Sequence, residues 1–553
     1  MRTGWGTILS AFLIGGPVMA QEAADVLLYN GRIYTLAEPA QVEAMVLRGD
    51  RIAAVGSAAE LRRRFRARTE VDLAGRVVLP GLIDGHAHLM GLGLSMLQAD
   101  LVGANSKEEI LERLRRFAQN FASGSWIMGR GWDQNRWPEK AFPTAEDLDR
   151  VFPDRPVWLR RIDGHAAWAN SKAMALAGIT AQTPDPEGGK ILRHPDGRPT
   201  GVFIDRAMTL VERVIPPPSE EELERALELA IRECLRYGIT GVHDAGVDGR
   251  TIERYRRFID QGRFPLRVYA MIGGVGETLS RFCSQGPLIG YGGNRLTVRA
   301  VKLYADGALG SRGAALLADY ADDPGNRGLL IVSADSLAQQ VERVMRCGFQ
   351  VAIHAIGDRG NRVALEAIAY ALSRTGRRDL RPRIEHAQVV ALEDIARFRE
   401  LGVIASMQPI HATSDMYWAE QRVGPVRIRG GYAWRRFLDA GVRFAAGSDF
   451  PVEPVNPFWG IYAAVTRQDL QGWPPGGWYP DQRLTRLEAL RAFTLGAAYA
   501  AFEEDLKGSL EPGKLADFIV IDQDVFTIPE REIANVRVLE TWLGGERVYR
   551  AGR

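Results

Sequence analysis

The stretch at residues 77–91, VVLPGLIDGHAHLMG, leads from an apolar, strand-like run into two histidines that are separated by a single alanine. Side chains two residues apart on a β-strand point to the same face, so the imidazoles of His86 and His88 can converge on one point. Two histidines that face the same way form half of a metal site. Alternatively, they are polar residues that leave a core and form ordinary hydrogen bonds, and residues further along the chain decide between the two interpretations.

Seven more strand-like segments follow, and amphipathic helical segments lie between several of them. This alternation is typical of a parallel α/β architecture. Together with the strand that ends at His86 and His88 the count is eight, so the sequence predicts a (β/α)8 barrel. The seven segments are residues 238–246, 265–274, 296–308, 349–358, 381–390, 402–409 and 442–451.

Both ends of the chain carry short segments that alternate apolar and polar residues, which predicts antiparallel strands. Neither end has enough strands for a stable sheet, so we expect residues 21–79 and 500–553 to form one small β-domain together. Residues 80–499 then form the barrel. The connection after its first strand, an insertion at about residues 92–218, is far longer than an ordinary loop, and we expect it to cover the active site.

The first twenty residues contain Arg2, an apolar run and small residues before Gln21, which is the layout of a cleavable secretory signal. We therefore expect a periplasmic or secreted protein without a stable membrane anchor after cleavage, with an uncleaved anchor as the alternative. The cysteines Cys234, Cys283 and Cys347 are odd in number and widely spaced, and we interpret them as buried free thiols.

The overall composition indicates the kind of partner. Hydrophobic residues make up 46% and charged residues 25%, as in a globular protein with a large core. The formal net charge is only +2, and no basic stripe suits nucleic acid, so we expect a small-molecule substrate. Association into a homo-oligomer stays open.

Active sites of such barrels lie at the carboxyl ends of the strands, and several strands contribute to them. Half of the chain's eight histidines stand at these ends, where a lysine and an aspartate accompany them. Imidazole nitrogen and carboxylate oxygen suit a divalent metal such as zinc, with one position open for water. The residues are His86, His88, Lys302, His354, His386 and Asp449.

A metal at these residues would support hydrolysis. It lowers the pKa of bound water from about 15.7 toward about 7 and polarises a substrate carbonyl. Asp449 would take a proton from the attacking water and pass it to the leaving nitrogen. Lys302 does not suit this set, because an ammonium group cannot bind a cation, and pairing with Asp306 is its ordinary alternative.

Six motifs resemble the metal-dependent amidohydrolase superfamily, and more narrowly its amidohydrolase-3 branch, which includes N-substituted formamide deformylases. They are PGLIDGHAH, VKLYADGALGSRGAAL, VAIHAIGD, IEHAQ, AAGSDFPV and GSLEPGKLADFIVID, and the resemblance covers essentially the whole mature chain. It implies that the terminal β segments form a small β-sandwich. It also implies a site for one or two metal ions with His86, His88, His354, His386 and Asp449 as ligands.

The resemblance further implies that carbon dioxide carboxylates Lys302 to a carbamate that bridges two metals. A single-metal site with unmodified Lys302 remains the alternative. Weaker candidates could contact substrate, each with a packing or loop role as its alternative. These are Trp132, Asp133 and His165 in the insertion, Asp306 and Arg312 after the fourth barrel strand, and His411 after the seventh.

The leading functional interpretation is a metal-dependent hydrolase of non-peptide carbon–nitrogen bonds in an amide, a formamide or a cyclic amide. Ester or lactone hydrolysis at the same site is one alternative. A non-catalytic periplasmic protein that binds a metal or ligand is another. A glycosidase would need two facing carboxylates, and the strand ends carry histidines in their place.

Overall fold

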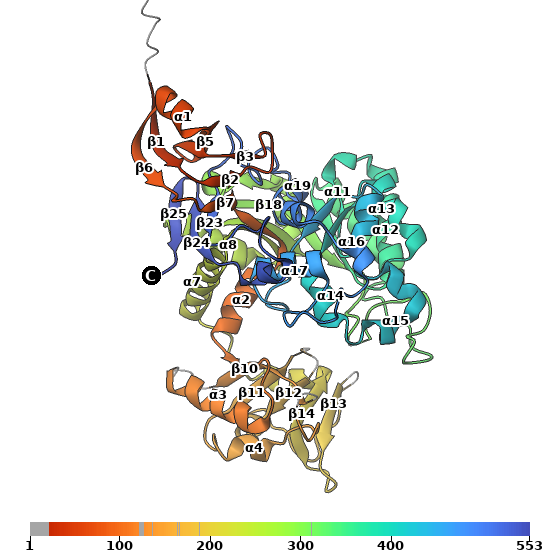
Figure 1. Ribbon diagram of the computed structural model, residues 1–553. Helices are drawn as coiled ribbons and strands as arrows, with labels where there is room; N and C mark the ends of the chain where they lie inside the picture. Colours follow the sequence, from red (N-terminus) through yellow and green to blue (C-terminus); the bar gives the residue numbers. More distant parts are fainter. Residues whose placement is uncertain are drawn as a thin grey trace, which may run out of the picture.

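The computed structural model describes residues 21–120, 126–134, 137–162, 164, 166–186, 189–310 and 312–552. It confirms the expected fold class: a parallel eight-stranded barrel, a β-sandwich built from both termini, and a long insertion after the first barrel strand (Figure 1). Across the described ranges, no helix has both the length and the apolar character to cross a membrane.

The barrel strands are buried on both faces over most of their length, so apolar residues such as Val, Ile and Ala occur on both sides of each strand. Seven neighbouring pairs are parallel. Around the barrel the order is β8 (Leu82–Ala87), β15 (Ile239–Val247), β16 (Arg267–Gly273), β18 (Leu296–Tyr304), β19 (Gln350–Ala355), β20 (Arg383–His386), β21 (Ile404–Met407) and β22 (Phe444–Ala446).

A buried carboxylate closes the barrel between β8 and β22. Asp84 accepts hydrogen bonds from the backbone N–H of His86 (3.1 Å) and from the backbone N–H and hydroxyl of Ser448 (3.0 and 2.6 Å). The N–H of Asp449 in turn donates to the carbonyl of His86 at 2.8 Å. The first and last strands are therefore fixed side by side at their carboxyl ends.

Helices surround the barrel and bury their apolar faces against it. In α7 (Glu220–Arg236), Ser219 and Glu222 form a capping box, and the buried stripe that includes Leu227, Ile231 and Cys234 recurs at helical spacing. Further helices are α8 (Gly249–Asp260), α9 (Glu277–Gln285), α11 (Ala334–Arg346), α12 (Asp358–Thr375), α13 (Ile395–Leu401), α16 (Trp434–Asp439) and α17 (Pro457–Thr466).

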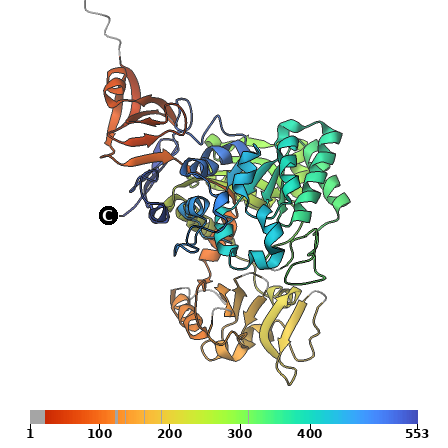
Figure 2. The ribbon, with the colours of Figure 1, turned by 45° about the vertical axis from the view of Figure 1, so that its right-hand side comes forward.

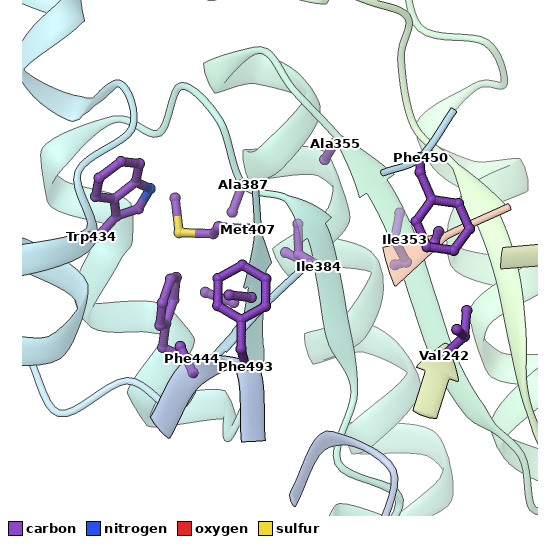
Figure 3. Packing of buried hydrophobic residues seen from close by; sticks show 14 of the residues in the cluster. Val242, Ile353, Ala355, Ile384, Ala387, Met407, Trp434, Phe444, Phe450 and Phe493 are labelled. Carbon is purple, nitrogen blue, oxygen red and sulfur yellow. The ribbon is translucent and has the colours of Figure 1, made fainter. Parts of the chain in front are cut away.

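The main hydrophobic core lies between these helices and the strands (Figure 3). Ile384 of β20, Met407 of β21 and Phe444 of β22 pack in one cluster with Trp434 of α16 and Phe493, all of them almost completely buried. Large apolar side chains therefore fill the space between the strands and the helices. The polar residues of the site lie elsewhere, at the carboxyl ends of the strands.

The two termini build the β-sandwich. One sheet has the order β5-β4-β1-β6, and in the other, β25-β24-β23-β7-β2-β3, the N-terminal β7 pairs with the C-terminal β23. Side chains of both sheets share one core, which includes Leu28, Met45, Phe518 and Trp542. The bounds are β1 (Glu22–Tyr29), β2 (Arg32–Tyr34), β3 (Gln41–Val42), β4 (Ala44–Arg48), β5 (Arg51–Gly56), β6 (Phe65–Asp72), β7 (Val77–Pro80), β23 (Phe518–Ile521), β24 (Val538–Leu543) and β25 (Glu546–Arg550).

The insertion is a separate layer that leaves the barrel through α2 (Leu89–Met96) (Figures 1 and 2). Its sheet has the order β13-β14-β12-β11-β10-β9 and its own core. The Arg130 guanidinium donates to the carbonyl of Pro451 at 3.0 Å, so the insertion touches the chain just after Asp449. Its elements are β9 (Ala99–Asp100), α3 (Lys107–Asn120), β10 (Ile127–Trp132), α4 (Ala145–Asp149), β11 (Val157–Arg161), β12 (Ala166–Ala169), α5 (Ser171–Leu176), β13 (Gly189–Arg193) and β14 (Pro199–Asp205).

Two cysteines are not free thiols. Cys283 in α9 and Cys347 at the end of α11 form a disulfide with their Cα atoms 4.9 Å apart, whereas Cys234 is buried and free. The expectation of three free thiols was wrong because 64 residues separate this pair in the sequence. The helices follow β16 and β18, which are neighbours in the barrel.

A buried ion pair joins the barrel to the sandwich. Arg267 of β16 contacts both carboxylate oxygens of Asp517 at 2.6 and 2.8 Å, and both side chains are less than 5% exposed. Burial alone would raise the pKa of Asp517, but the Arg267 charge outweighs it and lowers that pKa below its usual value. The ionised form therefore stabilises the fold above the unfolded-state pKa of about 3.9, and this contribution is lost as the pH falls through the lower folded-state pKa.

We expect Asp517→Asn to lower the free energy of unfolding by about 3–5 kcal/mol, because Arg267 would keep a buried charge without a counter-ion. Urea unfolding at neutral pH measures the change. The control is Glu70→Gln, which removes the partner of Arg62 in an exposed pair and should leave the midpoint almost unchanged. Equal effects of the two substitutions would contradict the role assigned to the buried pair.

Candidate active site

The six residues expected to hold metal meet at the mouth of the barrel. Ligand atoms of His86, His386 and Asp449 lie within 4.8 Å of one another. The remaining three adjoin this group: His88 Nε2 lies 3.2 Å from Asp449 Oδ1, Lys302 Nζ lies 3.2 Å from His86 Nε2, and the rings of His354 and His386 have centroids 4.5 Å apart.

The backbone at two of these strand ends is strained. His386 has a φ of 73° and Asp449 a φ of 63°, in the left-handed region that side-chain-bearing residues seldom adopt. Such residues cost about 1–3 kcal/mol each and persist only when surrounding contacts impose them. The turn at each strand end thus directs His386 and Asp449 into the mouth at a cost to stability.

Three imidazoles of the site are neutral at physiological pH. Burial, together with the nearby Lys302, lowers the pKa of His86 to about 4 and that of His354 to about 3. Burial likewise lowers the pKa of His386 far below its usual value. A neutral imidazole keeps a lone pair, which is the form that binds a metal.

Each of three histidines has its Nδ1 atom engaged by an oxygen of the protein, so that Nε2 is free to face the cluster. Partners of this kind fix the tautomer and the ring orientation of metal-binding histidines. The pairs are His86 Nδ1 with Glu385 Oε2 (2.5 Å), His88 Nδ1 with the carbonyl of Ala245 (2.9 Å), and His386 Nδ1 with Gln408 Oε1 (2.8 Å).

Glu385 and Arg383 are site residues that the sequence analysis missed. Both are completely buried, and Arg383 donates to both carboxylate oxygens of Glu385 and to the carbonyl of Gly85. Burial would raise the pKa of Glu385, but the charge of Arg383 and the hydrogen bond with His86 lower it well below its usual value. Their alternation in the strand RIEH was an available signal, because charged residues two apart on a buried strand point to the same side.

Lys302 is buried among the other residues expected to bind metal, and burial lowers its pKa to about 8. Its ammonium is not paired with Asp306. That carboxylate accepts three backbone N–H bonds of 2.8–2.9 Å from Ala315, Ile356 and Gly357. The ordinary alternative for Lys302, a pair with Asp306, is therefore absent.

The two oxygens of Asp449 have different surroundings. Oδ2 lies 3.6 Å from His411 Nε2, and His411 Nδ1 lies 3.0 Å from Glu453 Oε1. Burial disfavours a charged His411, but Asp449 and Glu453 raise its pKa to about 10. Oδ1 is buried, faces the Nε2 atoms of His86 and His88, and accepts no hydrogen bond from any described residue. A carboxylate oxygen that accepts no hydrogen bond and lies among imidazole nitrogens fits a divalent metal.

The insertion residues expected to contact substrate behave differently. The Trp132 ring is completely buried among Trp137 and Trp168, and its N–H donates to the carbonyl of Leu159 at 2.8 Å. Trp132 therefore packs the insertion core, which corrects the expected contact with substrate. Asp133 forms an ion pair with Arg161 at 2.5 Å. His165 lies outside the described residues.

The loop after β18 also differs from expectation. The bonds of Asp306 to three backbone N–H groups fix the chain around Ala315 and Gly357, and Arg312 pairs with Asp322 at 2.9 Å. Asp306 is completely buried and holds the loop together, which argues against the substrate contact expected for it. The substrate contact expected for Arg312 stays a prediction. His411, in α14 (Pro409–Asp415), reaches the cluster through Asp449.

Comparisons with known proteins agree with this geometry. The amidohydrolase family model matches residues 69–549, and that of an imidazolonepropionase-like composite domain of bacteria matches residues 44–67. Protein LONG AFTER FAR-RED 3 of Arabidopsis thaliana is 36% identical over 99% of this chain and 94% of its own length, and N-substituted formamide deformylase of Arthrobacter pascens is 29% identical over 95% and 98%. The crystal structure of an uncharacterized metal-dependent hydrolase from Pyrococcus horikoshii OT3 superposes with a TM-score of 0.76 and 32% identity over 91% of this chain and 99% of that chain. The chain therefore belongs to the amidohydrolase family and is a metal-dependent hydrolase of carbon–nitrogen bonds other than peptide bonds.

Proposed function

We propose that the substrate is a small-molecule amide, either a linear amide, a formamide or a cyclic amide, and that Asp449 transfers the proton in its hydrolysis. The single observation that carries this proposal is the buried Oδ1 of Asp449, which lies among the imidazoles of His86, His88 and His386 and accepts no hydrogen bond from a described residue. A carboxylate oxygen in such surroundings needs a cation or a proton donor to offset its burial.

The residues that would hold one or two zinc ions are His86, His88, Lys302, His354, His386 and Asp449. When bound, a divalent metal supplies a water of lowered pKa and polarises the scissile carbonyl. Lys302 would take part as a carbamate, because its Nζ lies 3.2 Å from His86 Nε2, where an ammonium would repel the metal.

The protein's own residues then move the proton. Asp449 accepts it from the attacking water and delivers it to the leaving nitrogen, so that the carbon–nitrogen bond breaks. The His411 ring lies 3.6 Å from Oδ2, and we infer that this ion pair keeps Oδ1 directed toward the histidines. Glu385 contacts Nδ1 of His86 and so holds its imidazole in place, and Arg383 in turn donates to Glu385.

A formamide is supported by the likeness to N-substituted formamide deformylase over nearly the whole chain. Esters and lactones are the alternative substrates, because the same groups would serve them. A non-catalytic binding protein is disfavoured, because the residue for proton transfer is present and its oxygen is accessible to the cluster.

We predict that metal content and hydrolytic activity depend on the same residues. Wild type purified without chelator and with bicarbonate should bind one or two zinc ions per chain and hydrolyse members of a panel of N-substituted formamides and amides. His386→Ala should lose metal and at least about a thousandfold in kcat/KM, since both water activation and carbonyl polarisation depend on the ion. Metal content by plasma mass spectrometry and amine release measure these effects.

The control for this experiment is His194→Ala, which alters a histidine of the insertion and should change neither quantity. Lys302→Ala separates the two forms of the site, because loss of one ion of two supports a carbamate bridge. Wild-type protein that binds no added zinc would contradict the proposal. Normal metal content with hydrolysis of esters alone would replace amides by esters as the substrate.

The kinetics of a His411 variant distinguish two roles of this residue. If it positions Asp449, His411→Gln should lower kcat by about tenfold or more and change KM little, because a proton-transfer step is affected in the bound complex. If His411 instead binds substrate, KM should rise and kcat should change less. Steady-state kinetics on the metal-loaded variant distinguish the two, and unchanged kinetics would exclude both roles.

We also propose that the protein is exported to the periplasm or secreted. The disulfide between Cys283 and Cys347 supports an oxidising compartment, and the signal-like N-terminal sequence supports passage to it.

Export predicts that the native host contains a processed chain that begins near Gln21 in its periplasmic or extracellular fraction. Unfolded under non-reducing conditions, this chain should show one reactive thiol, from Cys234, and three after reduction. Mass spectrometry of the alkylated protein measures both properties. An unprocessed chain with three thiols in the cytosolic fraction would contradict export.

A further inference from the structure

Tyr304 stands at the edge of the metal-ligand cluster and has no assigned role. It is the last residue of β18, two positions after Lys302, so both side chains point to the same side of the strand. Its ring centroid lies 4.8 Å from Lys302 Nζ and 5.4 Å from the centroid of His354. Yet Tyr304 is 41% exposed, and no described residue forms a hydrogen bond with its hydroxyl.

Two strand ends beside Tyr304 carry exposed glycines. Gly246 is near the end of β15 and Gly273 is at the end of β16. A Cβ atom added to Gly246 would lie 3.6 Å from the Tyr304 hydroxyl, and one added to Gly273 would lie 3.1 Å from the carbonyl of Gly246. The ring thus borders two exposed backbone positions that carry no side chain.

The strand order places Tyr304 across the mouth from Asp449. In the barrel order β22-β21-β20-β19-β18-β16-β15-β8, the strand of Tyr304 is four places from the strand before Asp449, which is half of the circle. The leaving nitrogen must come within hydrogen-bond reach of Asp449 to receive its proton. The group on the other side of the scissile carbon, the acyl substituent, therefore extends toward β18.

We propose that Tyr304, together with the backbone of Gly246 and Gly273, forms a subsite for a planar apolar acyl substituent of the substrate. The inference rests on the proposed amide hydrolysis and adds the class of acyl group. An aromatic ring in this space can stack on the exposed part of Tyr304, and the glycines leave room for its thickness. A formyl group, with only a hydrogen at this position, leaves the subsite empty.

The experiment compares three amides of one amine, with formyl, acetyl and phenylacetyl as acyl groups. Wild type should favour the phenylacetyl compound in kcat/KM. Tyr304→Ala should reduce the ratio of phenylacetyl to formyl turnover by about tenfold or more, since burial of an aromatic group against the ring is lost. Tyr304→Phe retains the ring and should retain the ratio.

Tyr370→Ala is the matched control, because Tyr370 is 43% exposed on the outer helix α12. It should leave the ratio unchanged. A ratio that is equal in wild type and Tyr304→Ala would overturn the subsite. A wild type that prefers the formyl compound would also overturn it.

A binding measurement separates failure of the subsite from failure of the proposed hydrolysis. Calorimetric titration of zinc-loaded protein with phenylacetate and with acetate requires no turnover. Phenylacetate should bind about tenfold or more tightly than acetate to wild type and to Tyr304→Phe, and this difference should vanish in Tyr304→Ala. If no amide is hydrolysed but this difference is found, the subsite stands and the reaction is wrong. If amides are hydrolysed and both acids bind equally, the subsite is wrong.

Discussion

The carboxylate of Asp84 is the contact on which the site depends. It bonds the backbone of His86 at the end of β8 and the backbone and hydroxyl of Ser448 after β22. Burial raises the pKa of Asp84 to about 7, so the charge is costly and is kept only because these donors surround it. In return, the first and the last barrel strands are joined at the level where His86 and Asp449 must meet.

Charge balance beneath the cluster imposes a second constraint. Arg383 is completely buried and meets Glu385, whose other oxygen holds His86 at 2.5 Å. A lone buried guanidinium or carboxylate would be strongly unfavourable, whereas the pair satisfies both and leaves His86 oriented. The interior of the barrel therefore carries the opposite charges of Arg383 and Glu385 before any metal binds. Lys302 and Asp449 are two further ionisable groups at the mouth.

The sequence was sufficient for the barrel and for the meeting of the six cluster residues, because strand ends of a parallel barrel lie at one edge whatever the lengths between them. It was insufficient where a residue's partner depends on packing. Trp132 is the last residue of a strand, a position that suits contact with substrate, but its ring is buried in the core of the insertion. Asp306 follows Lys302 closely, yet three N–H groups of distant loops surround it. The pairing of Cys283 with Cys347 can be recognised only when it is known that the helices after two neighbouring barrel strands lie side by side.

Among the described residues of the cluster, His88 and His354 have more exposed side chains than His86. The side chain of His88 is 34% exposed and that of His354 14%, whereas that of His86 is completely buried beneath them. A substrate must therefore approach from the side of His88 and His354, where Arg130 of the insertion contacts Pro451 and Tyr304 is exposed. For the proposed amides, the buried half of the cluster, with Glu385 and Arg383 behind it, supplies the same chemistry whatever their substituents. The exposed half borders the strand ends, and we infer that selectivity among the proposed amides arises there.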